Sequence, residues 1–427
     1  MKKIYANGSD ELEFFRELDK RHGETNKKVT ETVSEIIENV RENGDKAVKD
    51  YTLKFDGSLP EYYEIPRDVI NDALDEADED YVDALLNAME NIADFHNRQR
   101  QQGFINAKKN GVIMGQRIRG LERVGLYVPG GTAAYPSSVL MNAIPAKIAG
   151  VKEIIMVTPP CKDGTPNKDI LTAAAVCGVD RIFMLGGAQA IAALAYGTET
   201  IPKVDKIVGP GNIYVATAKK LLFGTVDIDM IAGPSEILVM ADDTANPKFV
   251  AADLMSQAEH DVMASSILVT TSETLADKVL AEIDRQAENL SRKDIIKKSL
   301  ENYGAVIITD CRHCAVELAN AIAPEHLEVH MENPMELLGS LDNAGSIFLG
   351  QYASEPLGDY YAGPNHVLPT SGTARFFSPL GVDSFIKKIS YTYYTEDALS
   401  EAKKDIVTIA EREGLTAHAN AIKVRFE

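Results

Sequence analysis

The sequence predicts an α/β protein of two tandem Rossmann-like units, each a parallel sheet flanked by helices, with small helical N- and C-terminal segments. Three observations predict this fold. Short β-branched runs alternate with helical patterns from about residue 122 to 235, and the alternation resumes from 237 to 349. Residues 29–102 and 396–412 show only helical periodicity and are rich in acids. Strands and helices that alternate at this spacing are typical of parallel sheets covered on both faces.

The individual elements follow from hydrophobic runs bounded by glycines and other turn residues. In the first unit we expect strands at 124–128, 154–157, 182–184, 207–208 and 226–228, and helices at 138–149, 170–176, 189–196 and 213–222. In the second unit we expect strands at 237–240, 267–269, 306–308, 327–329 and 347–349, and helices at 248–260, 274–290 and 312–322. Asn246 followed by Pro247 is a helix-start signal.

Composition and charge exclude several classes of function. The 427 residues include 44 Lys+Arg and 64 Asp+Glu, which gives a formal net charge of −20. A surface this acidic repels nucleic acids and anionic membranes, and no basic patch interrupts it, so we expect no nucleic-acid partner. No run approaches the ~18 apolar residues of a membrane span, and no signal peptide is evident. With only four cysteines, we expect a reduced, cytoplasmic protein without a membrane partner.

The common phosphate-binding loops are missing from the sequence. The nearest match to GxGxxG is at 209–214, where Tyr214 stands in the third glycine position, and no GxxxxGK[ST] loop occurs. Glycines do cluster where predicted strands of the first unit end, at 130–131, 186–187 and 209/211. Such an edge is where open α/β sheets bind ligands, but glycines also mark ordinary turns. The pattern leaves these two interpretations equally open.

Several histidines stand beside acidic residues in predicted loops. Glu325 and His326 follow Pro324, which favours a loop just before a strand, and a carboxylate beside an imidazole can act as an acid/base pair. Gln257 and His260 share one face of a predicted helix, which could hold a metal. Any one histidine alone is more simply structural, but together they favour a metal or acid/base site.

Two further features favour structure over chemistry. His330 alternates with Glu328 along a strand, and we expect it at the surface. Cys311 and Cys314 resemble a redox CxxC, but we favour buried structural thiols, since free cysteines are commonly buried.

Seven segments together resemble the histidinol dehydrogenase family, in the family's order and across essentially the whole chain. They are GLYVPGG at 125–131, GGAQA at 186–190, GPGN at 209–212, IDMIAGPSE at 228–236, SQAEHD at 256–261, APEHL at 323–327 and NHVLPT at 365–370. The family oxidises L-histidinol to L-histidine in two NAD-linked steps, with one zinc ion per subunit, as a homodimer with shared active sites. The resemblance implies the same substrate, cofactors and partner here.

The resemblance also implies roles for individual residues. Glu325 and His326 match the acid/base pair. Zinc ligands are implied at Gln257, His260, Asp359 and His418. NAD contacts are implied at Tyr127, Gln189 and Asn212. Substrate contacts are implied at Ser235, Gln257, His260, His326, Asp359, His366, Glu413 and His418.

Four parts of the chain are expected on the same basis. Residues 1–27 would be a dimer-associated segment, and 28–122 plus 236–380 a larger α/β domain with the zinc and acid/base residues. Residues 123–235 would bind NAD, and 381–427 would be a helical tail that reaches the partner's active site.

The residue types suit this chemistry. An imidazole can accept the proton of an alcohol, and Glu325 could activate water for the aldehyde step, because no cysteine lies in a matched segment to act as a nucleophile. Three alternatives stay open: oxidation of a different small polar alcohol, zinc-dependent hydrolysis without NAD, and a non-catalytic two-lobed binding protein.

Overall fold

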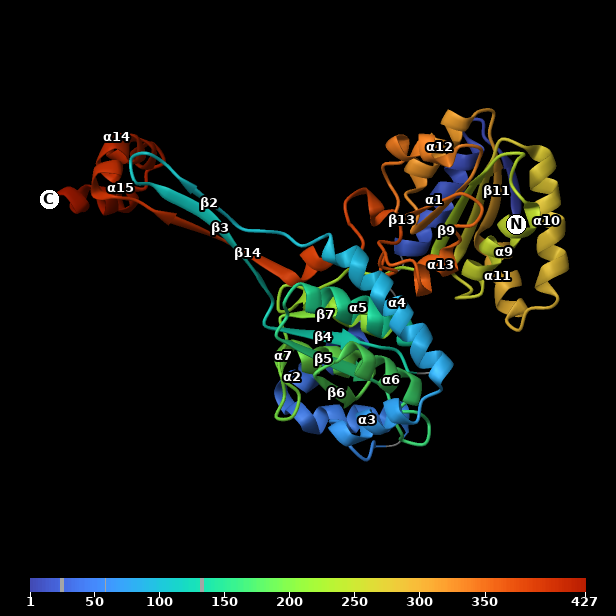
Figure 1. Cartoon of the computed structure of the whole chain (residues 1–427), viewed down its shortest axis with the longest axis horizontal. Coiled ribbons are helices and arrows are strands. Elements are labelled where there is room, and N and C mark those ends of the chain that lie inside the picture. The colour runs from blue at the N-terminus through green and yellow to red at the C-terminus, as the bar shows by residue number, and fades with distance from the viewer. Residues whose placement is uncertain (24–26, 58, 131–133) are drawn as a thin grey trace.

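The protein is described by a computed structural model that covers residues 1–23, 27–57, 59–130 and 134–427. Two parallel sheets with helices on both faces form the body, and a long antiparallel arm projects from it (Figure 1). The predicted α/β class is therefore confirmed. Gly131 of the GLYVPGG segment lies outside the described residues.

The six-stranded sheet is parallel and has the order β1-β11-β10-β9-β12-β13. Its strands are β1 (Lys2–Tyr5), β9 (Glu236–Ala241), β10 (Ser265–Thr270), β11 (Gly304–Ile308), β12 (His326–His330) and β13 (Ser346–Leu349). Around it lie α1 (Asp10–Gly23), α9 (Pro247–Ala258), α10 (Glu273–Ala287), α11 (Lys293–Tyr303), α12 (Arg312–Ile322), α13 (Glu355–Tyr360) and the 3-10 helix η1 (Pro334–Ser340). Ile237 and Val239 share a core with α9, α10 and α11, whereas Leu238 and Met240 share one with α1 and α12. Burial on both faces explains the unbroken apolar run at 237–240.

The five-stranded sheet is also parallel, with the order β6-β5-β4-β7-β8. Its strands are β4 (Arg123–Tyr127), β5 (Glu153–Thr158), β6 (Arg181–Met184), β7 (Lys206–Val208) and β8 (Asp227–Ile228). Its helices are α2 (Lys27–Asp56), α3 (Arg67–Asp75), α4 (Glu79–Asn97), α5 (Pro136–Ile148), α6 (Lys168–Cys177), α7 (Gly187–Tyr196) and α8 (Ile213–Leu222). One face is covered by α3 to α6, and the opposite face by α2, α7 and α8.

The packing differs from the predicted division of the chain. Helices α2, α3 and α4 pack on the five-stranded sheet, so grouping 28–122 with 236–380 was wrong for these helices. Within the segment predicted to be dimer-associated, β1 pairs with β11 and α1 contributes Phe14 and Leu18 to the core of the six-stranded sheet. Helical periodicity identifies the buried face of a helix but does not say which sheet that face covers.

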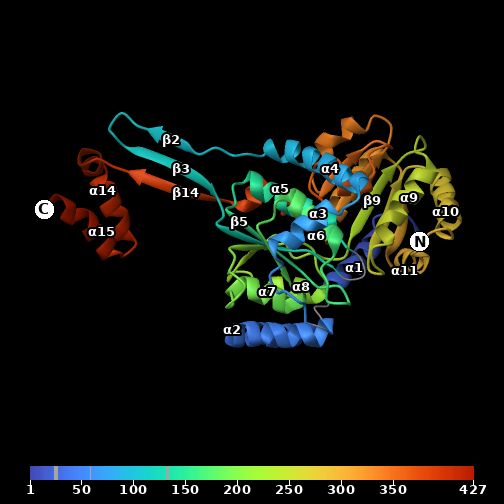
Figure 2. The ribbon, with the colours of Figure 1, turned by 60° about the horizontal axis from the view of Figure 1, so that its bottom comes forward.

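The arm combines segments far apart in the sequence. The strands β2 (Phe104–Ala107), β3 (Ile113–Gly120) and β14 (Ile386–Tyr393) form an antiparallel sheet in the order β14-β3-β2. Helices α14 (Glu396–Arg412) and α15 (Thr416–Lys423) follow, and the C-terminus lies at the tip of the arm in both ribbon views (Figures 1 and 2). The remaining 3-10 helices are η2 (Thr373–Arg375), η3 (Val382–Phe385) and η4 (Val424–Phe426).

The predicted helix at 396–412 is confirmed, whereas the strands of the arm were not predicted. Every residue of β2 is exposed, and so is all of β14 after its first residue. β2, with four residues, is too short to show an apolar alternation, whereas in β14 Ile389, Tyr391 and Tyr393 alternate with Ser390 and Thr392, a strand signal that was not recognised in the sequence. Throughout the described parts of the chain, no helix is both long and apolar enough to cross a bilayer.

Candidate active site

Glu325 and His326 lie at the amino end of β12, where the loop from α12 enters the six-stranded sheet. Ala323 ends α12 in a left-handed conformation with a φ of 53°, and Pro324 cannot continue the helix. β12 pairs in parallel with β9, so that His326 stands beside Ile237. Glu325 lies in the loop, as predicted, whereas His326, which was also expected in the loop, is the first residue of the strand.

The His326 ring has one nitrogen bound and the other free. Its Nδ1 lies 2.9 Å from the backbone oxygen of Glu236, and because a carbonyl only accepts, Nδ1 carries the hydrogen and donates it. Its Nε2 is buried without a hydrogen-bond partner. Burial lowers the pKa of the imidazole below its ordinary value. The ring is therefore neutral at pH 7, with a lone pair on Nε2, as a general base requires.

The Glu325 carboxyl contacts the same peptide segment. Its Oε2 accepts a hydrogen bond of 2.9 Å from the backbone N–H of Glu236 and lies 3.7 Å from Nδ1 of His326. Burial raises the pKa of this carboxyl well above its usual range. Glu325 therefore binds a proton more strongly than a surface glutamate does, which suits a group that must take up and release one.

Helix α13 brings Asp359 to this pair. Its Oδ1 lies 4.0 Å from Nε2 of His326, and its backbone oxygen accepts a hydrogen bond of 3.1 Å from Nδ1 of His366. Burial lowers the pKa of His366 to about 4, so this imidazole is also neutral. Burial, reinforced by the charge of Glu355, raises the pKa of the Asp359 carboxyl. Residues that are far apart in the sequence thus form one buried cluster of ionisable side chains.

Three side chains close to this pair could hold a metal ion. Ligand atoms of His260, Glu355 and Asp359 all lie within 4.8 Å of one another. His260 follows the end of α9, and its Nδ1 donates to the backbone oxygen of Ser256 over 3.1 Å, which leaves Nε2 to coordinate an ion. Gln257 is 1% exposed, and its Oε1 is buried without a partner. An orphaned buried acceptor of this kind fits a cation ligand.

Sequence reasoning missed Glu355. Its carboxyl accepts a hydrogen bond of 3.0 Å from the hydroxyl of Ser256 on α9. Its place four residues before Asp359, on one face of a short helix, is the signal that could have identified it. Ser235 lies directly before β9 and next to Glu236, whose backbone binds both Glu325 and His326.

Glu413 and His418 lie far from these residues within one chain. Glu413 caps α14 and His418 belongs to α15, both exposed near the tip of the arm (Figures 1 and 2). They line an open groove together with the exposed apolar side chains of Ile409 and Leu415. A single chain therefore does not bring them to the other predicted site residues.

The residues predicted to contact NAD gather at the carboxyl edge of the five-stranded sheet. Gln189 and Asn212 line one cavity of about 360 Å³ between α2, α7 and α8. The Tyr127 hydroxyl, at the end of β4, accepts a hydrogen bond of 3.1 Å from the backbone N–H of Gly187, which also lines the cavity. Gly209 has a φ of 112°, and a Cβ there would lie 2.1 Å from the Tyr127 backbone oxygen, so only glycine allows this close approach.

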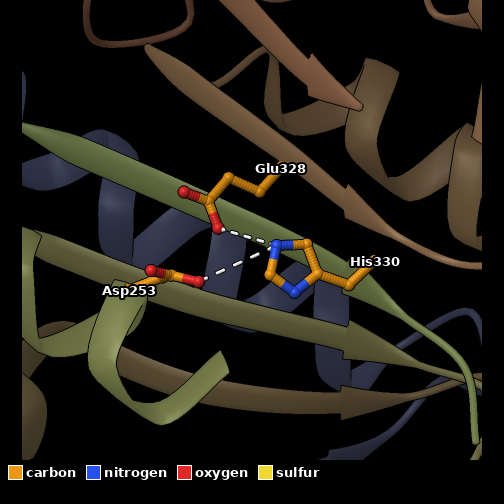
Figure 3. Close-up of side chains that lie close together, drawn as sticks. All are labelled: Asp253, Glu328 and His330. Atoms are coloured by element: carbon orange, nitrogen blue, oxygen red, sulfur yellow. Dashed lines mark ion pairs between the residues drawn. The ribbon is translucent and has the colours of Figure 1, made fainter. Parts of the chain in front are cut away.

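Two expectations about structure were wrong. Cys311 and Cys314 are not buried thiols, because they form a disulfide at the half-exposed start of α12. His330 is not at the surface, because it is 1% exposed and lies against Glu328 and Asp253 (Figure 3). A strand covered on both faces has no solvent side, so alternation of polar residues there does not indicate exposure.

Comparison with known proteins identifies the family of the chain. Residues 19–426 match the family model described as histidinol dehydrogenase. The chain is 60% identical over 426 residues to histidinol dehydrogenase of Clostridium acetobutylicum, covering 100% of this chain and 99% of the relative. It is 59% identical to that of Listeria innocua, covering 93% of each.

A solved structure gives the same result at the level of the fold. The crystal structure of histidinol dehydrogenase from Elizabethkingia anophelis superimposes with a TM-score of 0.93 at 39% identity, covering 100% of this chain and 98% of that one. The chain therefore belongs to the histidinol dehydrogenase family of oxidoreductases.

Proposed function

We propose that the protein carries out the last steps of histidine biosynthesis, the four-electron oxidation of L-histidinol to L-histidine through L-histidinaldehyde, with NAD and one zinc ion per subunit. The observation that carries this proposal is the buried Glu325–His326 pair with a free Nε2 on His326, beside the His260, Glu355 and Asp359 cluster. Family membership supplies the substrate class.

His326 acts as the base in the first oxidation. Its Nε2 accepts the hydroxyl proton of the alcohol, because that nitrogen alone is free of the backbone. The hydrogen bond from Nδ1 to Glu236 fixes the tautomer and the ring orientation, so Nε2 stays aimed into the site. NAD, when bound, accepts a hydride from the substrate carbon in each of the two oxidations.

Glu325 acts in the second oxidation. It takes a proton from the water that adds to the aldehyde, giving the hydrate from which the second hydride leaves. A cysteine nucleophile is the alternative for such a step. Cys311 and Cys314 are joined to each other, and burial raises the pKa of Cys177 to about 12. Cys161 lies in a loop of the other sheet's domain, after β5. These features favour the hydrate route.

Zinc would be held by Gln257, His260, Asp359 and the His418 of a second copy of the chain. Bound there, zinc would position the imidazole and amine nitrogens of histidinol. The orphaned Oε1 of Gln257 and the oriented ring of His260 support this ligand set. Ser235 and His366, which lie around the same residues, and Glu413 of the second copy would contact the substrate.

NAD would be held in the cavity lined by Gln189 and Asn212, with Tyr127 behind it. Asn212 is the N-cap of α8, and its side chain accepts from the backbone N–H groups of Tyr214 and Val215. Gln189 is 1% exposed and its Oε1 has no partner, so a ligand group in the cavity could satisfy it. Helix N-termini on α7 and α8 favour an anionic ligand despite the net negative charge of the chain.

A homodimer with shared sites accounts for the arm. The exposed apolar residues of α14 and α15, among them Ile409 and Leu415, need a surface to cover them. If the arm of one copy packed against a second copy, His418 and Glu413 of the first copy would lie beside the site residues of the second.

Counting the reduced cofactor tests the overall reaction. Two NADH should form per histidinol, with little trappable aldehyde, because one acid/base pair serves both steps in one site. The measurement is absorbance at about 340 nm, the reduced-nicotinamide band. One NADH with accumulated aldehyde would contradict the proposal, and turnover without NAD would favour the hydrolase alternative. Replacing all four cysteines by serine is the matched control and should keep turnover within about tenfold.

Separate assays with histidinol and histidinaldehyde test the two roles. Glu325→Gln should slow aldehyde oxidation more than alcohol oxidation, because the amide keeps the size but cannot accept a proton. His326→Asn should slow alcohol oxidation at least as much. Losses of ~10²- to 10⁴-fold are expected for a positioned base. Aldehyde oxidation at the wild-type rate in Glu325→Gln would show that the assigned role is wrong.

Removal of metal tests the zinc assignment. A chelator should abolish turnover while the protein stays folded by circular dichroism, because two helix-covered sheets do not need one ion to form a core. Added Zn²⁺ should restore turnover. If the chain is shown by elemental analysis to be metal-free and is still fully active, zinc has no part in the reaction.

A mixing experiment tests whether sites are shared. His326→Ala and His418→Ala, each inactive, are unfolded and refolded together. Random pairing makes about half of the dimers mixed, and each mixed dimer holds one intact site of two, so about a quarter of full activity should return. Each variant refolded alone, and refolded wild type, are the controls. If His418 served its own chain, the mixture would be no more active than the separate variants.

A further inference from the structure

A buried ion pair lies beside the turn that follows β7 and leads to the cavity proposed for NAD. Lys219 comes from the last turn of α8, and Asp229 directly follows β8. Their side chains are only 5% and 2% exposed. Burying two charges costs free energy, and apolar side chains of similar size would fill the same space without that cost. The reason for this pair therefore lies in what its polar atoms bind.

Both charged groups bind the backbone of the same residue, Gly209. The backbone N–H of Gly209 donates to Oδ2 of Asp229 over 2.8 Å, and Nζ of Lys219 donates to the backbone oxygen of Gly209 over 2.9 Å. Oδ1 of Asp229 contacts Nζ of Lys219 and accepts a hydrogen bond of 2.6 Å from the backbone N–H of Met230. Charge-assisted hydrogen bonds are roughly twice as strong as neutral ones. The donor and the acceptor of Gly209 are therefore both held firmly.

The turn that begins at Gly209 connects two residues of the proposed NAD site. It runs over residues 209–212 and ends at Asn212, which lines the cavity and caps α8. At its other end Gly209 lies against the backbone of Tyr127, where a Cβ would come within 2.1 Å of the Tyr127 oxygen. Glycine has more conformational freedom than any other residue, and both Gly209 and Gly211 belong to this turn. Contacts from outside the turn are therefore needed to hold it in one conformation.

Another ion pair on the same two strands offers a comparison. Lys206 and Asp227 begin β7 and β8, and Nζ of Lys206 lies 2.8 Å from Oδ2 of Asp227. Asp227 is half-exposed, and Lys206 also donates to the backbone oxygen of Ser384, outside the five-stranded sheet. This pair lies at the amino ends of the strands, whereas ligands of open α/β sheets bind at the carboxyl ends. Of the two pairs, Lys219 and Asp229 are thus the one that holds a turn at the ligand-binding edge.

We propose that Lys219 and Asp229 are positioning residues for NAD, because their ion pair holds the turn at 209–212 in the conformation that binds the dinucleotide. This inference rests on the proposed NAD-linked function. Neither residue is among the described residues that line the cavity, so the pair acts through Gly209 and not by contact with the cofactor. Without the pair, the turn would spend part of its time in other conformations. The apparent dissociation constant for NAD would then rise in inverse proportion to the fraction of molecules in the binding conformation.

Single and paired substitutions in the zinc-loaded, full-length protein test this inference. Lys219→Met alone, or Asp229→Leu alone, leaves a buried charge unpaired and should lower the melting temperature. The double variant removes both charges and should melt at a higher temperature than either single variant, although it cannot bind Gly209. Its dissociation constant for NAD, measured by calorimetry, and its KM for NAD should rise about tenfold, as expected if about a tenth of the molecules keep the turn in place. Its kcat at saturating NAD and its KM for histidinol should stay within about twofold of wild type.

Two further variants serve as controls. Lys206→Met combined with Asp227→Leu makes the same substitutions at the other end of β7 and β8, and it should leave the dissociation constant for NAD unchanged. Lys219→Arg keeps a positive charge and hydrogen-bond donors at the position. It should therefore bind NAD more tightly than Lys219→Met does.

The outcomes separate positioning from general stability and from the proposed function. A folded double variant that binds NAD as tightly as wild type would overturn the inference. Equal rises in both KM values, in the control pair as well as in the double variant, would also overturn it, because they would indicate a general loss of packing. If the double variant does not fold, Asp229→Asn takes its place, since the amide keeps the size and one acceptor oxygen but not the charge, and unchanged NAD binding there would have the same meaning. Failure of the proposed function would appear in wild type instead, as turnover without NAD or as no binding of NAD, and it would overturn this inference as well.

Discussion

Two hydrogen bonds to the backbone of one residue, Glu236, orient the proposed acid/base pair. The backbone N–H of Glu236 binds the Glu325 carboxyl, and its backbone oxygen binds the His326 ring. Both bonds exist because β9 and β12 lie side by side in the sheet, although about 90 residues separate them in sequence. Backbone groups cannot change rotamer, so they orient two side chains more rigidly than side-chain partners could. The free Nε2 of His326 is the direct consequence.

Desolvation by the surrounding fold then sets the proton affinities. The same burial that keeps His326 and His366 neutral raises the pKa of Glu325 and Asp359. Both shifts have the same cause, because burial penalises the charged form of each group, and both favour the uncharged forms of the carboxyls and the rings. The effect extends along β12 to Glu328 and His330, where polar groups are buried with no exit to solvent. A carboxyl that binds a proton and an imidazole that stays neutral cost less free energy to bury than charged groups do.

In the arm, unlike in the buried site, apolar side chains and two residues of the proposed site lie outside any core. Its edge strands β2 and β14 are almost entirely exposed, and Ile409 and Leu415 at its tip face solvent. Such a structure has little core of its own, which is what the proposed packing of the arm against a second copy would supply. Under the proposed dimer, the residues at its tip acquire a function that they cannot have within one chain.

The sequence by itself determined the fold class, the positions of most helices and strands of both sheets, and the family. These depend on local periodicity, turn residues and short segments, and local signals are what a sequence displays directly. It also placed Glu325 correctly, because Pro324 marks the loop before the strand, although His326 proved to be the first residue of that strand. Only the tertiary structure decided that α2 to α4 cover the five-stranded sheet, that β1 joins the six-stranded one, that Glu355 belongs to the site and that His330 is buried. Each of these features depends on which surfaces pack together, and the segments concerned are far apart in the sequence. The pattern of a single segment shows that it has an apolar face, but it does not show which other segment covers that face.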